Sequence, residues 1–214
     1  MDNVIITRKF KSPITWGDVA DEVHSGRGNQ LLEIGDTISA TLTNGKSMEF
    51  LVSAMNPYSS KEVAFSVLDC LSNRRLYMNR RDTNEGGWSA CDARAVLNSE
   101  IYDLLPDDMK KIIKPRVIVQ KINDELLEST DKLWYLSEKE LSNNDRGVDI
   151  DNVHFPVYDS RKSRIKCMDD VPTWYSTRSP DASTTTNFRY VHGNGLIYDH
   201  TASGSYGVAF GFLI

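Results

Sequence analysis

Apolar residues near the start of the chain recur at two different spacings. The first spacing is helical and follows Thr15, which can cap the start of a helix. It predicts a short helix that ends at Gly26 and packs through Trp16, Val19, Ala20 and Val23. Residues 37–52 then alternate with a period of two around Asn44-Gly45, a pair that suits a tight hairpin turn. Residues 63–68 repeat this period. One helix followed by three strands is therefore expected.

The middle of the chain returns to helical spacing. Apolar residues between Ser89-x-x-Asp92, which resembles a capping box, and Pro106 predict a helix, and residues 107–113 predict a further short one. Four elements are expected after it: a strand at 116–122, a strand at 131–136, a short helix opened by Ser137-x-x-Glu140, and a long polar surface loop at 143–159.

The last part of the chain, residues 174–214, has a different composition. It holds 8 of the 20 aromatic residues but only four charged ones, and Ser, Thr, Asn and Gly separate the rings. This pattern is typical of short strands joined by tight turns. Strands are expected at 187–192, 196–199 and 207–214. No linker is visible, so a single α+β domain is predicted over 1–214, with a helical segment (1–30), a scaffold (31–173) and an aromatic β segment (174–214).

Composition and charge exclude several function classes. The 25 Lys and Arg against 30 Asp and Glu give a net charge of -5, so we expect no nucleic-acid partner and no anionic membrane surface. The first residues lack the apolar stretch of a signal peptide, which predicts a cytoplasmic product on synthesis. Three widely spaced cysteines, Cys70, Cys91 and Cys167, indicate free thiols without a disulfide framework or a zinc site.

No pattern for catalysis or cofactor binding is found. The sequence has neither a Gly-x-Ser-x-Gly elbow nor a phosphate-binding loop, so no enzyme and no cofactor are predicted. His192 and His200 can approach each other across the predicted hairpin beside Asp199, but two neighbouring polar side chains without a metal are the favoured interpretation. Asp145, Asp149 and Asp151 do not follow the calcium-loop pattern, and a solvated loop is expected there. Whether a metal binds that loop stays open.

The aromatic β segment is the remaining candidate for function. Tyrosine interleaved with Ser, Asn and Gly is the composition of adaptable recognition surfaces, whereas alternating rings in strands are also usual in cores. We assign the rings of Trp174, Phe188, Phe210 and Phe212 to the core. The predicted ligand-binding residues, expected to be more exposed, are Asn187, Tyr190, Asn194, Tyr198, His200 and Tyr206.

Several short stretches, in a fixed order, resemble an uncharacterised bacterial and prophage family, a domain of unknown function of gut Firmicutes. The stretches include Asn84-Glu85-Gly86-Gly87-Trp88, Ile113-Lys114-Pro115, Arg178-Ser179-Pro180 and Ser205-Tyr206-Gly207-Val208. The C-terminal half of such proteins resembles the C-type-lectin-like fold of formylglycine-generating enzymes and variable phage tropism proteins. One departure is that Ala209-Phe210 stands where related proteins carry Arg-Pro.

The resemblance implies a binding role. Formylglycine-generating enzymes need a C-terminal cysteine pair, but no cysteine follows Cys167, which disfavours that activity. We therefore expect a non-enzymatic, prophage-encoded module that recognises a glycan or a protein at a bacterial surface. A structural phage tail or virion protein, with homo-oligomer contacts through the same surface, is the first alternative. An uncharacterised enzyme is the second.

Overall fold

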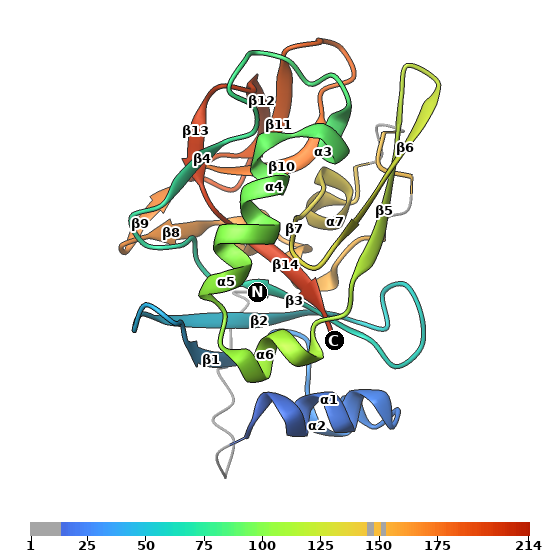
Figure 1. The fold of residues 1–214 in the computed structure, drawn as a ribbon, viewed down its shortest axis with the longest axis vertical. Coiled ribbons are helices and arrows are strands. Elements are labelled where there is room, and N and C mark those ends of the chain that lie inside the picture. The colour runs from blue at the N-terminus through green and yellow to red at the C-terminus, as the bar shows by residue number, and fades with distance from the viewer. Residues whose placement is uncertain (1–13, 145–147, 151–152) are drawn as a thin grey trace.

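Two five-stranded β-sheets form the framework of the protein (Figure 1). The computed structural model describes residues 14–144, 148–150 and 153–214. The first sheet has the strand order β1-β2-β3-β14-β7, and all its pairings are antiparallel. Its strands are β1 (Thr37–Thr41), β2 (Ser47–Met55), β3 (Val63–Val67), β7 (Trp134–Tyr135) and β14 (Phe210–Leu213). The last strand of the chain thus lies inside this sheet.

The second sheet has the strand order β12-β11-β10-β13-β4. Only the pairing of β10 with β13 is parallel in it. Its strands are β4 (Arg75–Tyr77), β10 (Tyr175–Pro180), β11 (Asn187–Val191), β12 (Ile197–Thr201) and β13 (Ser205–Gly207). Because β13 belongs to the second sheet and β14 to the first, the chain crosses between the sheets at Val208 and Ala209.

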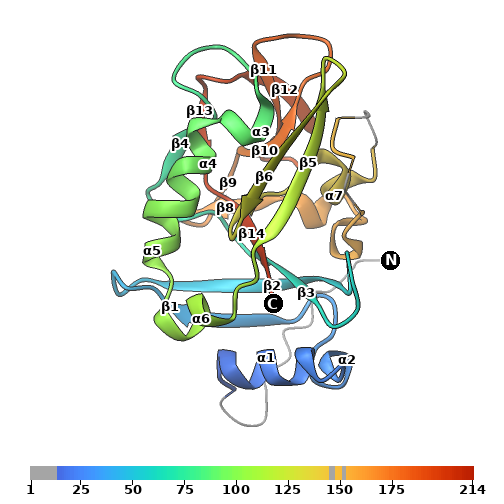
Figure 2. The same ribbon diagram turned by 45° about the vertical axis from the view of Figure 1, so that its right-hand side comes forward.

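Short helices and two hairpins complete the fold. Figures 1 and 2 show α1 and α2 beneath the first sheet, the helical run from α3 to α5 descending from the second sheet toward the first, and the long β5–β6 hairpin projecting upward. The helices are α1 (Trp16–His24), α2 (Gly28–Leu31), α3 (Gly87–Ala90), α4 (Asp92–Val96), the π-helix η1 (Leu97–Ile101), α5 (Tyr102–Leu104), α6 (Asp107–Ile112), α7 (Glu138–Ser142), and the 3-10 turns η2 (Pro156–Tyr158) and η3 (Lys162–Arg164). The hairpins are β5 (Arg116–Ile122) with β6 (Glu125–Asp131), and β8 (Lys166–Met168) with β9 (Val171–Thr173).

Aromatic side chains fasten α1 to the first sheet. The Trp16 ring meets Phe50, Phe65 and Phe212 edge-on, at centroid distances of 5.7, 5.6 and 6.0 Å. The rings of Phe65 and Phe212 stack at 5.3 Å. Buried residues of both sheets belong to the same hydrophobic cluster, so the two sheets share one core. Within the described residues, no helix combines the length and the apolar character needed to cross a bilayer.

Much of the predicted order of elements is confirmed. The helix at α1, the hairpin of β1 and β2, the strand β3 and the capping box of Ser137 and Glu140 are present. The chain is a mixed α+β protein with mostly antiparallel strands, as expected. Phe188, Phe210 and Phe212 are buried, as predicted. Ala209 and Phe210 are both buried as well, so an apolar pair fits the place where related proteins carry Arg-Pro.

Three predicted elements are wrong in detail. Ser89 lies inside α3, and Cys91 instead precedes α4. The strand expected at 131–136 is two strands, β6 and β7, and β6 escapes detection because its outer residues face solvent and break the apolar pattern. The strand expected at 207–214 is interrupted at Val208, because the chain changes sheets there.

Candidate functional site

Six aromatic side chains lie together on the face of the second sheet that points away from α7. We call this set the ring platform; it consists of Trp174, Tyr190, His192, Tyr198, His200 and Tyr206. Alternation along β11 and β12 places Tyr190, Tyr198 and His200 there, since Tyr190 is directly opposite Tyr198 and therefore shares its face. The residues between them point to the other face, where Arg189 forms an ion pair with Glu138 of α7.

The rings are in direct contact with one another. Tyr190 and Tyr206 stack with their centroids 5.3 Å apart and their planes 5° from parallel. Trp174 lies 5.4 Å from Tyr190 and 4.7 Å from His192. His200 meets the rings of Tyr190 and Tyr206 edge-on, at 6.0 and 5.5 Å. These distances are those of favourable aromatic pairs, so the platform is a preorganised surface.

The prediction that all three tyrosines are exposed is wrong for two of them. Tyr198 is 44% exposed, but Tyr190 and Tyr206 keep only 8% and 9% of their surface accessible. The two buried rings stack on each other and are flanked by Trp174 and His200, so the other platform rings cover much of their faces. Tyr198 and His200, on the edge strand β12, are the exposed members.

The two buried tyrosines of the ring platform are neutral phenols. Burial among the rings, with a smaller contribution from Tyr190, raises the pKa of Tyr206 to about 12. Burial and then the nearby charge of Asp199 raise the pKa of Tyr190. Both hydroxyls are therefore protonated at neutral pH and can donate a hydrogen bond to a ligand.

Two predicted ligand-binding residues do not belong to the ring platform. Asn187 alternates to the opposite face of β11, and its side-chain amide donates a hydrogen bond of 2.7 Å to Asp199. The Asn194 side chain closes the turn before β12, where its Oδ1 accepts a hydrogen bond of 3.0 Å from the backbone amide of Leu196. Both amides support the hairpin, which explains why polar residues recur there.

Two platform residues were missed or misassigned by the sequence interpretation. Trp174 was expected in the core, but it is half-buried at the entrance to β10 and joins the platform. His192 directly follows β11 and continues its alternation, so the period of two was a signal that could have placed it beside Tyr190. His192 and His200 contact different tyrosines: His192 lies 6.0 Å from Tyr198, and His200 lies 6.0 Å from Tyr190. Among the described residues, neither histidine forms a hydrogen bond with Asp199.

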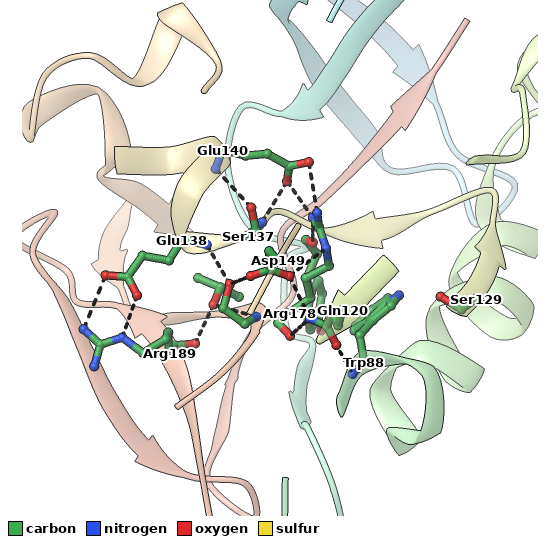
Figure 3. A network of polar contacts seen from close by, with 12 residues as sticks. Trp88, Gln120, Ser129, Ser137, Glu138, Glu140, Asp149, Arg178 and Arg189 are labelled. Atoms are coloured by element: carbon green, nitrogen blue, oxygen red, sulfur yellow. Dashed lines mark hydrogen bonds and ion pairs between the residues drawn. The ribbon is translucent and has the colours of Figure 1, made fainter. Parts of the chain in front are cut away.

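A second polar arrangement lies between the sheets and α7, but it is buried (Figure 3). The Glu140 carboxylate accepts hydrogen bonds from Arg178 and Tyr58 at 2.6 Å and from Arg116 at 2.7 Å. Burial alone would raise the pKa of Glu140, but the charges of Arg178 and Arg116 outweigh it and lower the pKa to about 2. A carboxylate held in this way is a poor base, so the arrangement is structural.

Asp149 corrects another expectation. It was placed in a solvated acidic loop, but it is only 6% exposed and accepts hydrogen bonds from Gln120 and Ser179. The backbone of residues 148–150 runs beside β5, which explains the burial. Asp145 and Asp151 lie outside the described residues. Within the described ranges, no group of three or more His, Cys, Asp or Glu side chains is arranged to hold a metal ion.

Comparison with known proteins places the chain in a family. The model of a domain of unknown function, DUF6273, matches residues 51–214, which include both sheets except β1 and the first residues of β2 and carry the complete ring platform. No curated protein and no solved structure matches the chain. Because the match covers more than half of the sequence, the chain belongs to the DUF6273 family.

Proposed function

We propose that the ring platform binds a carbohydrate chain and that the protein is a non-enzymatic binding module. The observation that carries this proposal is that the exposed rings of Tyr198 and His200 lie beside the stacked, buried pair of Tyr190 and Tyr206. A sugar ring has an apolar face of C–H groups, which packs against the face of an aromatic side chain. The hydroxyl groups of the sugar meanwhile need hydrogen-bond partners at the edge of the same surface.

The phenol groups supply such partners. In the described part of the chain, the hydroxyls of Tyr190, Tyr198 and Tyr206 have no hydrogen bond to a protein group. Each can therefore bond a ligand hydroxyl without first breaking a protein contact. The raised pKa values of Tyr190 and Tyr206 keep these donors neutral.

The sequence resemblance extends the proposal to the architecture of the protein and to the surface on which its ligand lies. We propose a C-type-lectin-like architecture and a prophage-encoded, virion-associated protein whose ligand is a glycan at a bacterial surface. A protein ligand on that surface is the competing outcome of the experiment below.

A glycan array tests the proposal with three proteins: the wild type, Tyr198→Ala and Leu126→Ala. Leu126 is the matched control, because it is an apolar residue of the β5–β6 hairpin and is 61% exposed. We expect the wild type and the control to bind the same glycans and Tyr198→Ala to bind them about tenfold more weakly. Binding to proteins of bacterial surface extracts but to no glycan would contradict the proposal, as would equal binding by all three proteins.

Size-exclusion chromatography with light scattering separates this role from a structural role in a virion. We expect Tyr198 to stay accessible, so that the wild type and Tyr198→Ala elute as the same species. A stable oligomer that dissociates when Tyr198 is replaced would identify the ring platform as a subunit contact and contradict the binding role.

A further inference from the structure

A cleft of about 450 Å³ lies apart from the ring platform. Three segments form most of its walls: the connection between β4 and α3, the turn of the β5–β6 hairpin and the loop between β10 and β11; Val148 completes the lining. Figures 1 and 2 show all three at the same end of the molecule. None of the six platform residues lines the cleft. Its volume falls in the range of roughly 300–1,000 Å³ that is usual for small-molecule sites.

Hydrogen bonds hold the walls of the cleft in place. The buried side-chain amide of Asn84 lies 2.8 Å from the carbonyl of Thr184, 2.9 Å from that of Asn187 and 3.1 Å from that of Asp181. The Asp181 carboxylate also accepts bonds of 2.7 Å from the amide and the hydroxyl of Ser183. The two loops therefore form a unit before any ligand arrives, which lowers the entropic cost of binding.

The lining combines hydroxyl groups, a small apolar area and carboxylates. Ser183, Thr184 and Thr185 supply hydroxyls, whereas Ile122, Val148 and Pro180 supply apolar surface. Such a mixture matches a polyhydroxylated molecule, which presents both hydroxyl groups and apolar C–H faces.

Negative charge predominates around the cleft. Asp82 and Glu85 line it together with Asp181, which is ion-paired with Arg189 at 3.4 Å. Among the described lining residues the one cation is Lys121, which is paired with Asp124 at 2.9 Å. Hydrogen bonds from Ser203 lower the pKa of Asp82, so this group is ionised at neutral pH. The Glu85 carboxylate is exposed and has no hydrogen bond or ion pair to a described residue. A cationic group is therefore favoured in the cleft, and an anionic one is repelled.

We propose that this cleft is a second binding site, which takes a small hydroxylated amine such as a hexosamine with a free amino group. The hydroxyls of the ligand contact the β10–β11 loop, its C–H face contacts Ile122 and Pro180, and its ammonium group lies near Asp82 and Glu85. The site is independent of the ring platform and stands whether or not the platform binds glycans.

Amide NMR titrations of the wild type with glucosamine, N-acetylglucosamine and glucuronic acid test the proposal. We expect glucosamine to shift the amide signals of Asn123, Thr184 and Thr185 and to bind roughly three- to fivefold more tightly than N-acetylglucosamine, because an exposed ion pair contributes little more than this. Glucuronic acid should leave the three signals unshifted at the same concentrations. Equal binding of glucosamine and N-acetylglucosamine, or shifts from glucuronic acid, would overturn the proposal.

Two variants test whether the preference for glucosamine over N-acetylglucosamine arises in the cleft. Glu85→Gln should remove most of the preference for glucosamine, whereas Glu128→Gln, an exposed carboxylate on β6 outside the cleft, should keep it. A retained preference in Glu85→Gln with an intact amide spectrum would contradict the role of this charge. Tyr198→Ala should titrate with glucosamine like the wild type, so a failure of the glycan array and a failure of this site are distinguishable.

Discussion

The ring of Tyr190 lies parallel to that of Tyr206, at 5.3 Å, although β10 separates their two strands in the second sheet. The β10 residue paired with Tyr190 is Ser176, whose small side chain is buried and shares the face of the rings. The rings therefore lean toward each other over a small residue. The contact between the two rings therefore depends on small neighbouring residues on this face of the sheet.

Gly204 limits the space for the rings at the edge of the platform. A Cβ atom at this position would lie 2.8 Å from the Tyr206 ring and its hydroxyl, and 3.0 Å from Nδ1 of His200. We expect Gly204→Ala to displace the Tyr206 ring, to weaken glycan binding several-fold and to lower the free energy of unfolding by about 1–3 kcal/mol. Affinity and urea unfolding, measured on the same protein, check both effects.

Gly17 provides the matched glycine control. It lies within α1, and the nearest atom to an added Cβ would be Oγ1 of Thr15 at 3.6 Å. Gly17→Ala should leave glycan binding unchanged and stabilise the protein by about 0.5–1 kcal/mol, because alanine is the better helix former. Unchanged binding by Gly204→Ala as well would show that the position of the Tyr206 ring is irrelevant.

Among the buried carboxylates, Glu140 should be the one whose substitution lowers the free energy of unfolding most. Glu140→Gln keeps the shape of the side chain but leaves the guanidinium groups of Arg116 and Arg178 without its charge between them. We expect a loss of about 3–5 kcal/mol in the free energy of unfolding at neutral pH. Thermal and urea unfolding give this value, and a loss below about 1 kcal/mol would contradict the assigned role.

The same group predicts an acid dependence of stability. The pKa of Glu140 in the folded protein is about 2, below its ordinary value of 4.5, so its contribution is fully present above pH 4.5 and is lost as the pH falls toward 2. Burial raises the pKa of Asp149, which acts in the opposite direction by favouring the folded state as the pH falls. The free energy of unfolding, measured with urea between pH 6 and 2, should therefore decline less steeply in Glu140→Gln than in the wild type. Parallel curves would rule out this linkage.

Asp131 should anchor the helical run to the β5–β6 hairpin. Its buried carboxylate accepts hydrogen bonds from Trp88 at 2.9 Å and from Arg94 and Ser129 at 2.7 Å. Asp131→Asn removes the charge that these donors share, and we expect a loss of about 1.5–3 kcal/mol in the free energy of unfolding. Hydrogen exchange should show faster opening of α3 and α4 in the variant. Exchange rates equal to those of the wild type would contradict the anchoring role.

Local patterns could predict those parts of the fold that depend on neighbouring residues. The period of two places Tyr198 and His200 on one face of β12, and the spacing of Ser137 and Glu140 identifies a helix start. Both features are fixed within one or two elements of the chain. They were accessible to sequence reasoning for that reason.

Features that depend on distant pairings could not be predicted. Tyr206 meets Tyr190 only because β13 pairs in parallel with β10, and the short β13 carries no sign of this partner. Asp149 lies in a polar stretch but is buried by contacts to Gln120 and Ser179 from two other elements. The hydroxyl-lined cleft likewise brings together three loops that are far apart in the sequence.

Fluorescence of Trp174 offers the most direct test of the ring platform. Trp16, Trp88 and Trp134 are 5%, 0% and 0% exposed, so Trp174 is the tryptophan that an aqueous quencher reaches most readily. A glycan that binds the array, added at saturation, should protect this emission from acrylamide in the wild type. Protection should be weaker in Tyr198→Ala at the same glycan concentration. Saturating glycan that leaves quenching unchanged would show that the sugar binds elsewhere and would contradict the account.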